Sequence, residues 1–131
     1  MEQTFIFIKP DVFNRNLEAQ VDLEIKAIAS QYELEVTREY IGVLTPEFLA
    51  YHYAVHLDKP FYEELIEDLQ NKPFHAYILT GTDAVNVGLN RIKMIIRGKY
   101  SIDKVENSIH SSDQTRTAKY EITNFTNHYP M

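Results

Sequence analysis

The stretch that decides the fold is Thr4-Phe5-Ile6-Phe7-Ile8, a continuous apolar run that ends at Lys9-Pro10-Asp11. A strand without a polar face is typical of the centre of a sheet, where both faces are covered. Pro10 cannot donate to a strand ladder and therefore ends the strand. Lys9 is then expected at the mouth of a central strand, where its ammonium group either finds an anionic partner or extends along its stem to water.

The remaining chain alternates between helical and strand patterns. Residues 17–28 carry apolar side chains at helical spacing, and residues 34–44 alternate in the manner of an edge or half-exposed strand. Two helices follow as a hairpin, opened by Thr45-Pro46-Glu47 and Asp58-Lys59-Pro60, with Tyr53 near its turn and Phe61 facing inward. We further predict a strand at residues 74–79, a helix from residue 83 that the chain leaves at residue 95, a last strand at residues 105–109 and a closing helix at residues 114–125.

This order of elements predicts an α+β fold, the ferredoxin-like βαββαβ sandwich. A four-stranded antiparallel sheet carries helices packed on it, and the helical hairpin is an insertion. The 131 residues are expected to form a single domain, residues 1–131, because a chain of this length builds one core. The tail, residues 127–131, is expected to trail over the surface.

Composition and charge argue against several classes of protein. The chain has no cysteine, which excludes disulfides and thiolate metal sites. Its start does not resemble a signal peptide, and no apolar run approaches the roughly 20 residues of a membrane span. We therefore expect a cytoplasmic protein without a membrane partner. A net charge of −6 counts against general nucleic-acid binding, which needs a positive surface.

The basic residues are nevertheless concentrated. Five of them fall within 14 residues that contain one acid, Asp103. Such a stretch in an acidic protein indicates a local site for a small anion, and a solvated basic face without a ligand is the alternative. The five residues are Arg91, Lys93, Arg97, Lys99 and Lys104.

A histidine stands in the stretch Asn107-Ser108-Ile109-His110-Ser111-Ser112-Asp113. Asp113 is suited to cap the helix that follows, and Glu121 lies beside the apolar face of that helix, so its carboxylate can fold back toward the loop that holds His110. An imidazole beside a carboxylate and a hydroxyl has an oriented tautomer, which suits a nucleophile or a general base. On these residues alone, a solvated loop histidine is the alternative.

Five short motifs in one order resemble the nucleoside diphosphate kinase family, and the resemblance runs from about Gln3 to about Phe125. It implies transfer of the γ-phosphoryl group of a nucleoside triphosphate, mainly ATP, to nucleoside diphosphates by a ping-pong route through phosphohistidine. The motifs are Ile8-Lys9-Pro10-Asp11, His52-Tyr53, Lys59-Pro60-Phe61, Ile96-Arg97-Gly98 and Asn107-x-Ile109-His110-x-Ser112-Asp113.

The resemblance also implies roles for single residues. His110 would be the nucleophile, and Glu121 with Ser112 would orient its ring and steady its positive charge. Lys9 and Arg97 would neutralise charge on the phosphoryl group in transit.

The nucleotide itself would meet three further side chains. Tyr53 matches the family tyrosine near the terminal phosphate, Asn107 matches the asparagine that bonds the sugar hydroxyl region, and Phe61 matches the aromatic on which the base stacks. Mg²⁺ would arrive bridging the nucleotide phosphates, because no cluster of carboxylates marks a dedicated metal site.

Two features depart from the family pattern. The segment before Arg97 is shorter than usual and lacks a loop that carries a phosphate-contacting threonine. In hexameric members of the family, that loop also contributes to contacts between subunits. We therefore expect a homo-oligomer but predict no number of subunits. In addition, Leu89 stands where the family has a phosphate-binding arginine. It shares the apolar face of its helix with Val85 and Ile92, so we expect it to be part of the core. Lys93, one helical turn further on, is expected to replace the arginine in part, without the bidentate fork.

Two other functions compete with an active kinase. A degenerate member that binds nucleotide or is phosphorylated on His110 but acts as a regulator with little turnover is favoured by Leu89 and the short segment. A ferredoxin-like domain can also bind single-stranded RNA on an aromatic-bearing sheet. The net charge of −6 and the absence of an Arg/Lys-Gly-aromatic signature oppose RNA binding.

Overall fold

The computed structural model describes residues 1–54, 57–103 and 106–130. Lys104 of the basic stretch, Val105 of the predicted last strand and Met131 of the tail lie outside the described residues. The elements are β1 (Glu2–Ile8), α1 (Pro10–Asn14), α2 (Glu18–Gln31), β2 (Glu35–Val43), α3 (Pro46–His52), α4 (Tyr62–Leu69), β3 (Pro73–Gly81), α5 (Ala84–Val87), a π-helical segment (Gly88–Lys93), α6 (Met94–Tyr100), β4 (Ile109–Ser111) and α7 (Thr115–His128).

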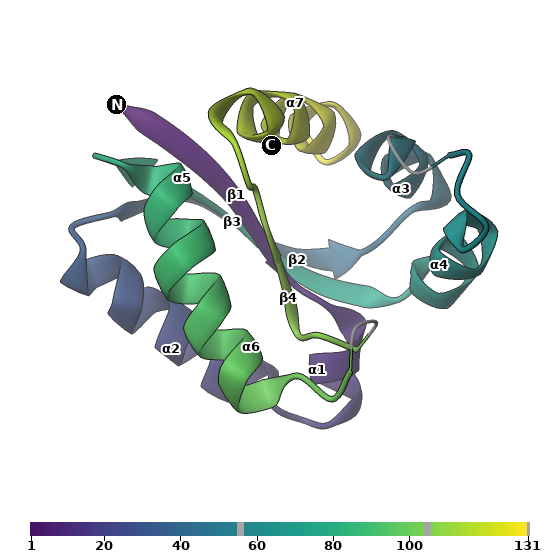
Figure 1. The fold of residues 1–131 in the computed structure, drawn as a ribbon, viewed down its shortest axis with the longest axis horizontal. Coiled ribbons are helices and arrows are strands. Elements are labelled where there is room, and N and C mark those ends of the chain that lie inside the picture. Colours follow the sequence, from purple (N-terminus) through teal and green to yellow (C-terminus); the bar gives the residue numbers. More distant parts are fainter. Residues whose placement is uncertain (55–56, 104–105, 131) are drawn as a thin grey trace.

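The four strands form one antiparallel sheet in the order β2-β3-β1-β4 (Figure 1). The apolar run 4–8 lies inside β1, which pairs with β3 on one side and β4 on the other, and every residue of the run is fully buried. The predicted central strand, the edge position of the second strand and the ferredoxin-like α+β fold are therefore confirmed.

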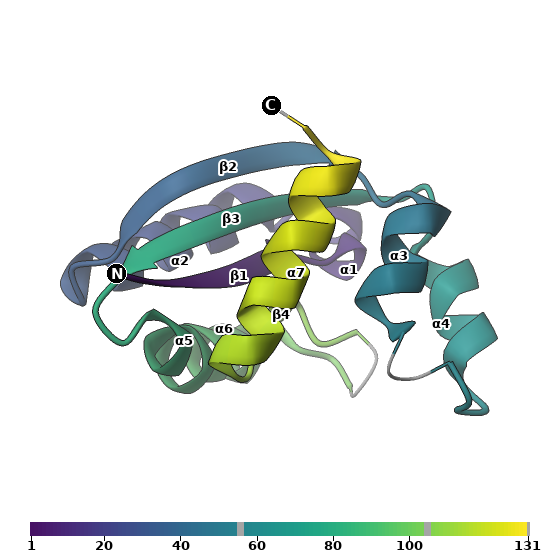
Figure 2. The same cartoon turned by 90° about the horizontal axis from the view of Figure 1, so that it is seen from above.

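The side chains of β1 alternate between two apolar clusters. Ile6 and Ile8 pack with residues of α2 and α6, and Phe5 and Phe7 pack with residues of α3 and α7. In Figure 1, α2 and α6 accordingly lie on one side of the strands, and α3 and α7 on the other. Figure 2 shows the helical hairpin α3–α4 side by side at one end of the sheet, as predicted. Thr45 caps α3 by accepting a hydrogen bond from the Phe48 amide at 3.2 Å.

The last strand is the first difference from the sequence prediction. β4 begins at Ile109 rather than at residue 105, and His110 lies within it, opposite Phe7 of β1. The expectation that His110 sits in a loop is therefore wrong. Because directly paired residues of neighbouring strands point to the same face of the sheet, His110 faces the same side as Phe7, and the two rings stack with centroids 5.2 Å apart.

The last two helices also differ from the prediction. The chain does not leave the helix at residue 95, because the helical path continues through the π-helical segment to Tyr100 and carries Arg97 in its last turn. The N-cap of α7 is Gln114 rather than Asp113. The tail does not trail over the surface, since Tyr129 is 5% exposed and packs in the same cluster as Phe5. Among the described residues, no helix has the length and apolar character needed to span a membrane.

Candidate active site at His110

The centre of the site is a short chain of contacts from β4 to α7. His110 Nε2 lies 2.9 Å from Glu121 Oε1, and the Ser112 hydroxyl donates to the same carboxylate oxygen at 2.6 Å. The Ser112 hydroxyl oxygen also accepts a hydrogen bond from the Phe5 amide at 3.2 Å, which fixes it against the central strand. The structure thus brings together three residues that the sequence predicted as one group.

Glu121 is held in its charged form. Burial alone would raise the pKa of this carboxyl, but the His110 ring, His52 and the Ser112 hydroxyl together outweigh burial and lower it. A charged carboxylate can only accept a hydrogen bond, so Nε2 carries the ring proton and donates it to that bond, and the nitrogen with the lone pair is Nδ1. The His110 side chain is 21% exposed, so its ring is neither sealed in the core nor fully in solvent.

His52 lies against the His110 ring, a contact that the sequence did not predict. It is buried at the end of α3, and its ring centroid is 4.4 Å from that of His110 in an edge-to-face arrangement. The only signal in the sequence was the dipeptide His52-Tyr53, which places a second imidazole beside a predicted site residue. The contact itself depends on how α3 docks beside β4.

A pocket of about 210 Å³ opens beside the ring. Two of the predicted site residues, Tyr53 and Lys93, line it. Burial, and after it the negative charge of Glu121, raises the pKa of the Tyr53 hydroxyl, so this group remains protonated. The lining residues are His52, Tyr53, Lys93, His110, Ser111, Asp113, Thr117, Tyr120 and Glu121.

Lys93 reaches this pocket from the π-helical segment, whose turn is wider than that of an α-helix. Burial, and after it the positive charge of Arg97, lowers the pKa of Lys93, whereas Asp113 and Glu121 oppose this effect. Leu89, on the preceding turn, is half-buried rather than part of the core. The structure therefore places a cation, Lys93, on the wall of the pocket that the His110 ring also lines.

Arg97 is fixed to the strand that carries His110. Its Nη2 donates to the Ile109 carbonyl oxygen at 3.0 Å, and its Nε is 3.3 Å from the same atom. The guanidinium group is therefore anchored one residue before the histidine.

Lys9 reaches the site from the other end of the chain. Its Nζ donates to Asn107 Oδ1 at 2.9 Å, and its backbone amide donates to the Ser108 carbonyl oxygen at 2.8 Å. Burial lowers the pKa of Lys9 to about 8, an effect that the charge of Arg97 reinforces and that of Asp11 opposes. Lys9 lines a different cavity of about 210 Å³ rather than the pocket at His110.

Phe61 departs from its predicted orientation. It is the N-cap residue of α4 and is 47% exposed, so it does not face inward with the apolar side of the hairpin. An exposed ring can present its face to a ligand, whereas a core ring cannot.

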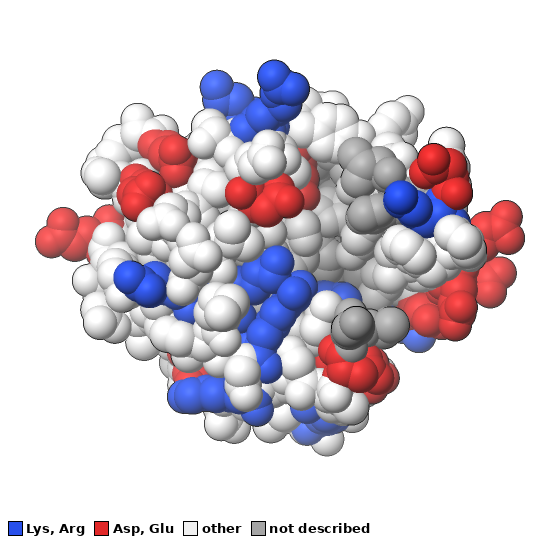
Figure 3. Space-filling model, in the orientation of Figure 1, with Lys and Arg blue, Asp and Glu red and all other residues white. Residues whose placement is uncertain are grey.

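The basic stretch divides into two sets. Lys93 and Arg97 face the region of His110, whereas Lys99 pairs with Glu24 on α2 and Arg91 lies over the Tyr32 ring. Figure 3 shows a band of Lys and Arg side chains across the middle of the face that carries α6 and β4.

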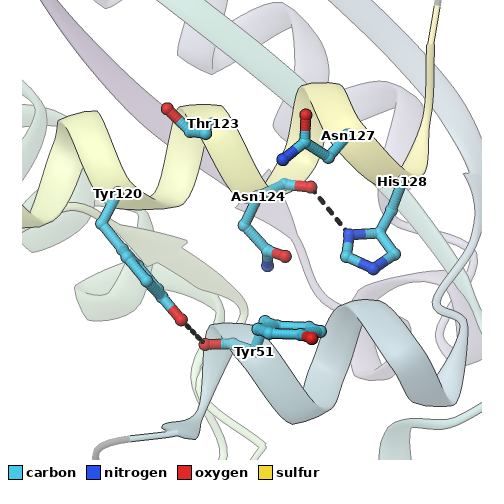
Figure 4. A pocket seen from close by; sticks show the side chains of 6 residues that line it. All are labelled: Tyr51, Tyr120, Thr123, Asn124, Asn127 and His128. Carbon is cyan, nitrogen blue, oxygen red and sulfur yellow. Dashed lines mark hydrogen bonds between the residues drawn. The ribbon is translucent and has the colours of Figure 1, made fainter.

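A separate groove of about 320 Å³ lies between α3 and α7 (Figure 4). Tyr120 lines both this groove and the His110 pocket, and its hydroxyl donates to the Tyr51 carbonyl oxygen at 2.7 Å. His128 in the groove donates from Nδ1 to the Asn124 carbonyl oxygen at 2.9 Å. The groove thus contains a histidine that is separate from the His52–His110 pair.

Comparison with known proteins identifies the family of this chain. The family model described as nucleoside diphosphate kinase matches residues 2–130. Curated nucleoside diphosphate kinases from Staphylococcus saprophyticus and Rhodovulum sulfidophilum are 36% and 32% identical, over 132 and 140 residues, covering 93% and 95% of this chain and 85% and 93% of those proteins. The crystal structure of the Encephalitozoon cuniculi nucleoside diphosphate kinase superposes with a TM-score of 0.82 at 31% identity, covering 95% of this chain and 88% of that one. The chain belongs to the nucleoside diphosphate kinase family.

Proposed function

We propose that the protein is an active nucleoside diphosphate kinase that transfers the γ-phosphoryl group of a nucleoside triphosphate, mainly ATP, to nucleoside diphosphates through phosphohistidine at His110. The observation that carries this proposal is the 2.9 Å contact between His110 Nε2 and Glu121 Oε1, in a pocket that Lys93 and Tyr53 also line. A solvated loop histidine would have no such buried carboxylate partner.

The contact selects the reacting nitrogen. Glu121 accepts a hydrogen bond from Nε2–H, and the Nδ1 lone pair attacks the γ-phosphorus. The bond between phosphorus and the bridging oxygen breaks, its electrons remain on the leaving nucleoside diphosphate, and Nε2 keeps its proton. The ring then carries a positive charge that Glu121 balances. In the second half-reaction, the terminal oxygen of an acceptor diphosphate attacks the phosphorus and Nδ1 leaves with its electron pair.

Cationic side chains stabilise the phosphoryl group in transit. Lys9, Arg97 and Lys93 supply the charge, and the neutral Tyr53 hydroxyl donates a hydrogen bond to the terminal phosphate. The anchoring of Arg97 to the Ile109 carbonyl holds its charge close to His110.

The nucleoside lies further from the histidine. Asn107, fixed by its contact with Lys9, bonds the sugar, and the exposed Phe61 ring stacks on the base. Mg²⁺ enters as part of the nucleotide. This fits the site, because both groups of potential metal ligands among the described residues contain histidine, whereas Mg²⁺ prefers oxygen.

We further propose a cytoplasmic homo-oligomer whose partners are nucleotides rather than nucleic acids or membranes. The edge strand β2 supports self-association, because Ile41 and Val43 are 60% and 49% exposed on it.

The decisive experiment is a two-step labelling assay. The protein is incubated with γ-labelled ATP, and an acid-labile, alkali-stable phosphoprotein is expected. Adding GDP then moves the label to GTP. The H110A variant takes up no label. A wild-type protein that takes up no label would contradict the proposal.

A second candidate is a degenerate regulator that is phosphorylated on His110 with little turnover. The observation that favours it is the half-buried Leu89, which offers no charge to the phosphates. In the same assay the regulator is labelled but does not pass the label to GDP, so the second step separates the two functions.

A further inference from the structure

Three side chains at the site have a property that phosphoryl transfer does not use. His52, His110 and Glu121 each offer one potential ligand atom, and these atoms all lie within 4.8 Å of one another. We propose that the three residues bind a transition-metal dication such as Zn²⁺, and that this ion holds the protein in its unphosphorylated state.

The chemistry of the three ligands selects the class of metal. Two imidazole nitrogens and one carboxylate oxygen are a common protein ligand set for open tetrahedral Zn²⁺ sites. Imidazole suits zinc, copper and nickel, whereas Mg²⁺ requires oxygen ligands. The site therefore distinguishes a transition-metal ion from the Mg²⁺ that enters with the nucleotide.

The surroundings hold two of the ligands in place. His110 Nε2 and Glu121 Oε1 are 2.9 Å apart, and Ser112 donates to Glu121 in the manner of an outer-shell partner that orients a ligating carboxylate. The third ligand, His52, stacks on Phe48 with ring centroids 5.4 Å apart. Ligand atoms around a tetrahedral zinc ion are about 3.3 Å apart, so a closing movement of the His52 ring completes the site.

The ion has a route to these ligands, and one charge opposes it. All three ligand residues line the pocket at His110, so an ion can reach them through this pocket. Lys93 lines the same pocket, and its positive charge repels a dication. The affinity for the ion is therefore raised by the three ligands and lowered by the positive charge of Lys93.

Metal binding excludes phosphorylation, an inference that rests on the proposed function. A neutral imidazole has one nitrogen with a lone pair and one with a proton. An ion bound at Nε2 of His110 takes that lone pair and the proton resides on Nδ1, which can then no longer attack phosphorus. An ion bound at Nδ1 occupies the reacting nitrogen directly. Either geometry disables the nucleophile, and binding at Nε2 also removes the proton that joins His110 to Glu121.

The binding test uses the full chain without nucleotide, so its outcome does not depend on activity. The protein is freed of metal and titrated with Zn²⁺ alone by calorimetry, and with Co²⁺ by visible absorption. One ion per chain is expected, with the intense absorption of tetrahedral Co²⁺. H52N, H110A and E121Q should each weaken zinc binding by more than the roughly 10–100-fold that loss of an outer-shell partner produces.

The matched control is H128N, since His128 lies in the separate groove between α3 and α7. It should bind zinc as the wild type does. K93M should bind zinc several-fold more tightly, because the opposing charge is gone. Thermal unfolding confirms that each variant is folded. Absence of zinc binding, or equal binding by the wild type and a folded H52N, overturns the metal site.

The exclusion is tested separately. The protein is loaded with one equivalent of Zn²⁺ and given labelled MgATP, and labelling of His110 should fall at least about tenfold and return with a zinc-selective chelator. For H52N, the ratio of the labelling rate with zinc to the labelling rate without zinc should be closer to one than for the wild type. Zinc binding without loss of labelling overturns the exclusion. A protein that binds zinc but is never labelled, even with chelator, contradicts the proposed kinase function and leaves the metal site standing.

Discussion

The Lys9 ammonium group donates a hydrogen bond of 2.9 Å to Asn107 Oδ1, which joins the end of the first strand to the segment that leads into His110. Burial of Lys9 lowers its pKa to about 8, so its charge is lost as the pH rises through that value. We expect kcat/KM for the nucleotide to fall from about pH 8 upward. At saturating nucleotide, kcat should fall at higher pH, because bound phosphate raises the pKa of Lys9 again.

The measurement is a pair of pH–rate profiles for the wild type and K9R. Arginine stays protonated throughout this range, so its kcat/KM profile should lack the fall above pH 8. The same fall in both proteins would contradict the assignment to Lys9.

Glu121→Gln keeps the shape of the side chain but removes its charge. We expect phosphorylation of His110 to slow by at least about 10²-fold, because the amide does not balance the charge of the phosphorylated ring. Rapid-quench kinetics with labelled ATP measures this step. The control is E67Q, an exposed carboxylate on α4, which should phosphorylate at the wild-type rate.

The same residue makes stability depend on pH. The pKa of Glu121 is lower in the folded protein than in the unfolded chain, so its charge stabilises the fold above the unfolded pKa, and this contribution is lost as the pH falls through the folded pKa. Between pH 5 and the acid limit of folding, roughly pH 3 to 4, the wild type should lose more unfolding free energy than E121Q. Urea titrations at each pH measure the difference, and parallel curves would exclude this linkage.

Lys93→Ala tests whether this lysine supplies the charge that Leu89 lacks. We expect KM for the nucleotide to rise several-fold, with K93R close to the wild type, because the ammonium group lines the His110 pocket. K99A is the matched control, since Lys99 pairs with Glu24 on α2. An unchanged KM in K93A would remove Lys93 from the site.

Tyr129 anchors the end of the chain. Its hydroxyl donates to the Val43 carbonyl oxygen at 2.7 Å and accepts from the Thr45 amide at 3.0 Å. Tyr129→Ala should lower the free energy of unfolding by about 3 kcal/mol, and Tyr129→Phe by about 1 kcal/mol. Chemical denaturation measures both. A loss below about 0.5 kcal/mol for Tyr129→Ala would show that the tail contributes little to the stability of the fold.

Much of the fold could be predicted because it depends on local patterns. The run 4–8 is apolar on both faces, which is typical of a covered central strand, and Thr45-Pro46 combines two helix-start signals. A last strand was predicted, but its bounds were wrong, because β4 has three residues that pair only with β1, and so short a segment carries too little pattern to fix its ends. The buried Tyr129 was missed because its partners lie on other elements.

The site shows the same division. The contact between His110, Ser112 and Glu121 could be predicted, because the three residues lie close together in the sequence and Glu121 is on the helix that follows the other two. His52 and the separation of Lys93 from Lys99 could not, because both depend on how helices dock. A helical period of 3.6 residues also cannot reveal the π-helical segment that carries Lys93.

The most direct test of the central claim identifies the phosphorylated nitrogen. The protein is labelled with ¹⁵N in histidine, phosphorylated with ATP, and examined in the folded state by NMR for coupling between phosphorus and each ring nitrogen. Coupling to Nδ1 of His110, with Nε2 still protonated beside Glu121, is the predicted result. Phosphate on Nε2, on another residue, or on none would contradict the account.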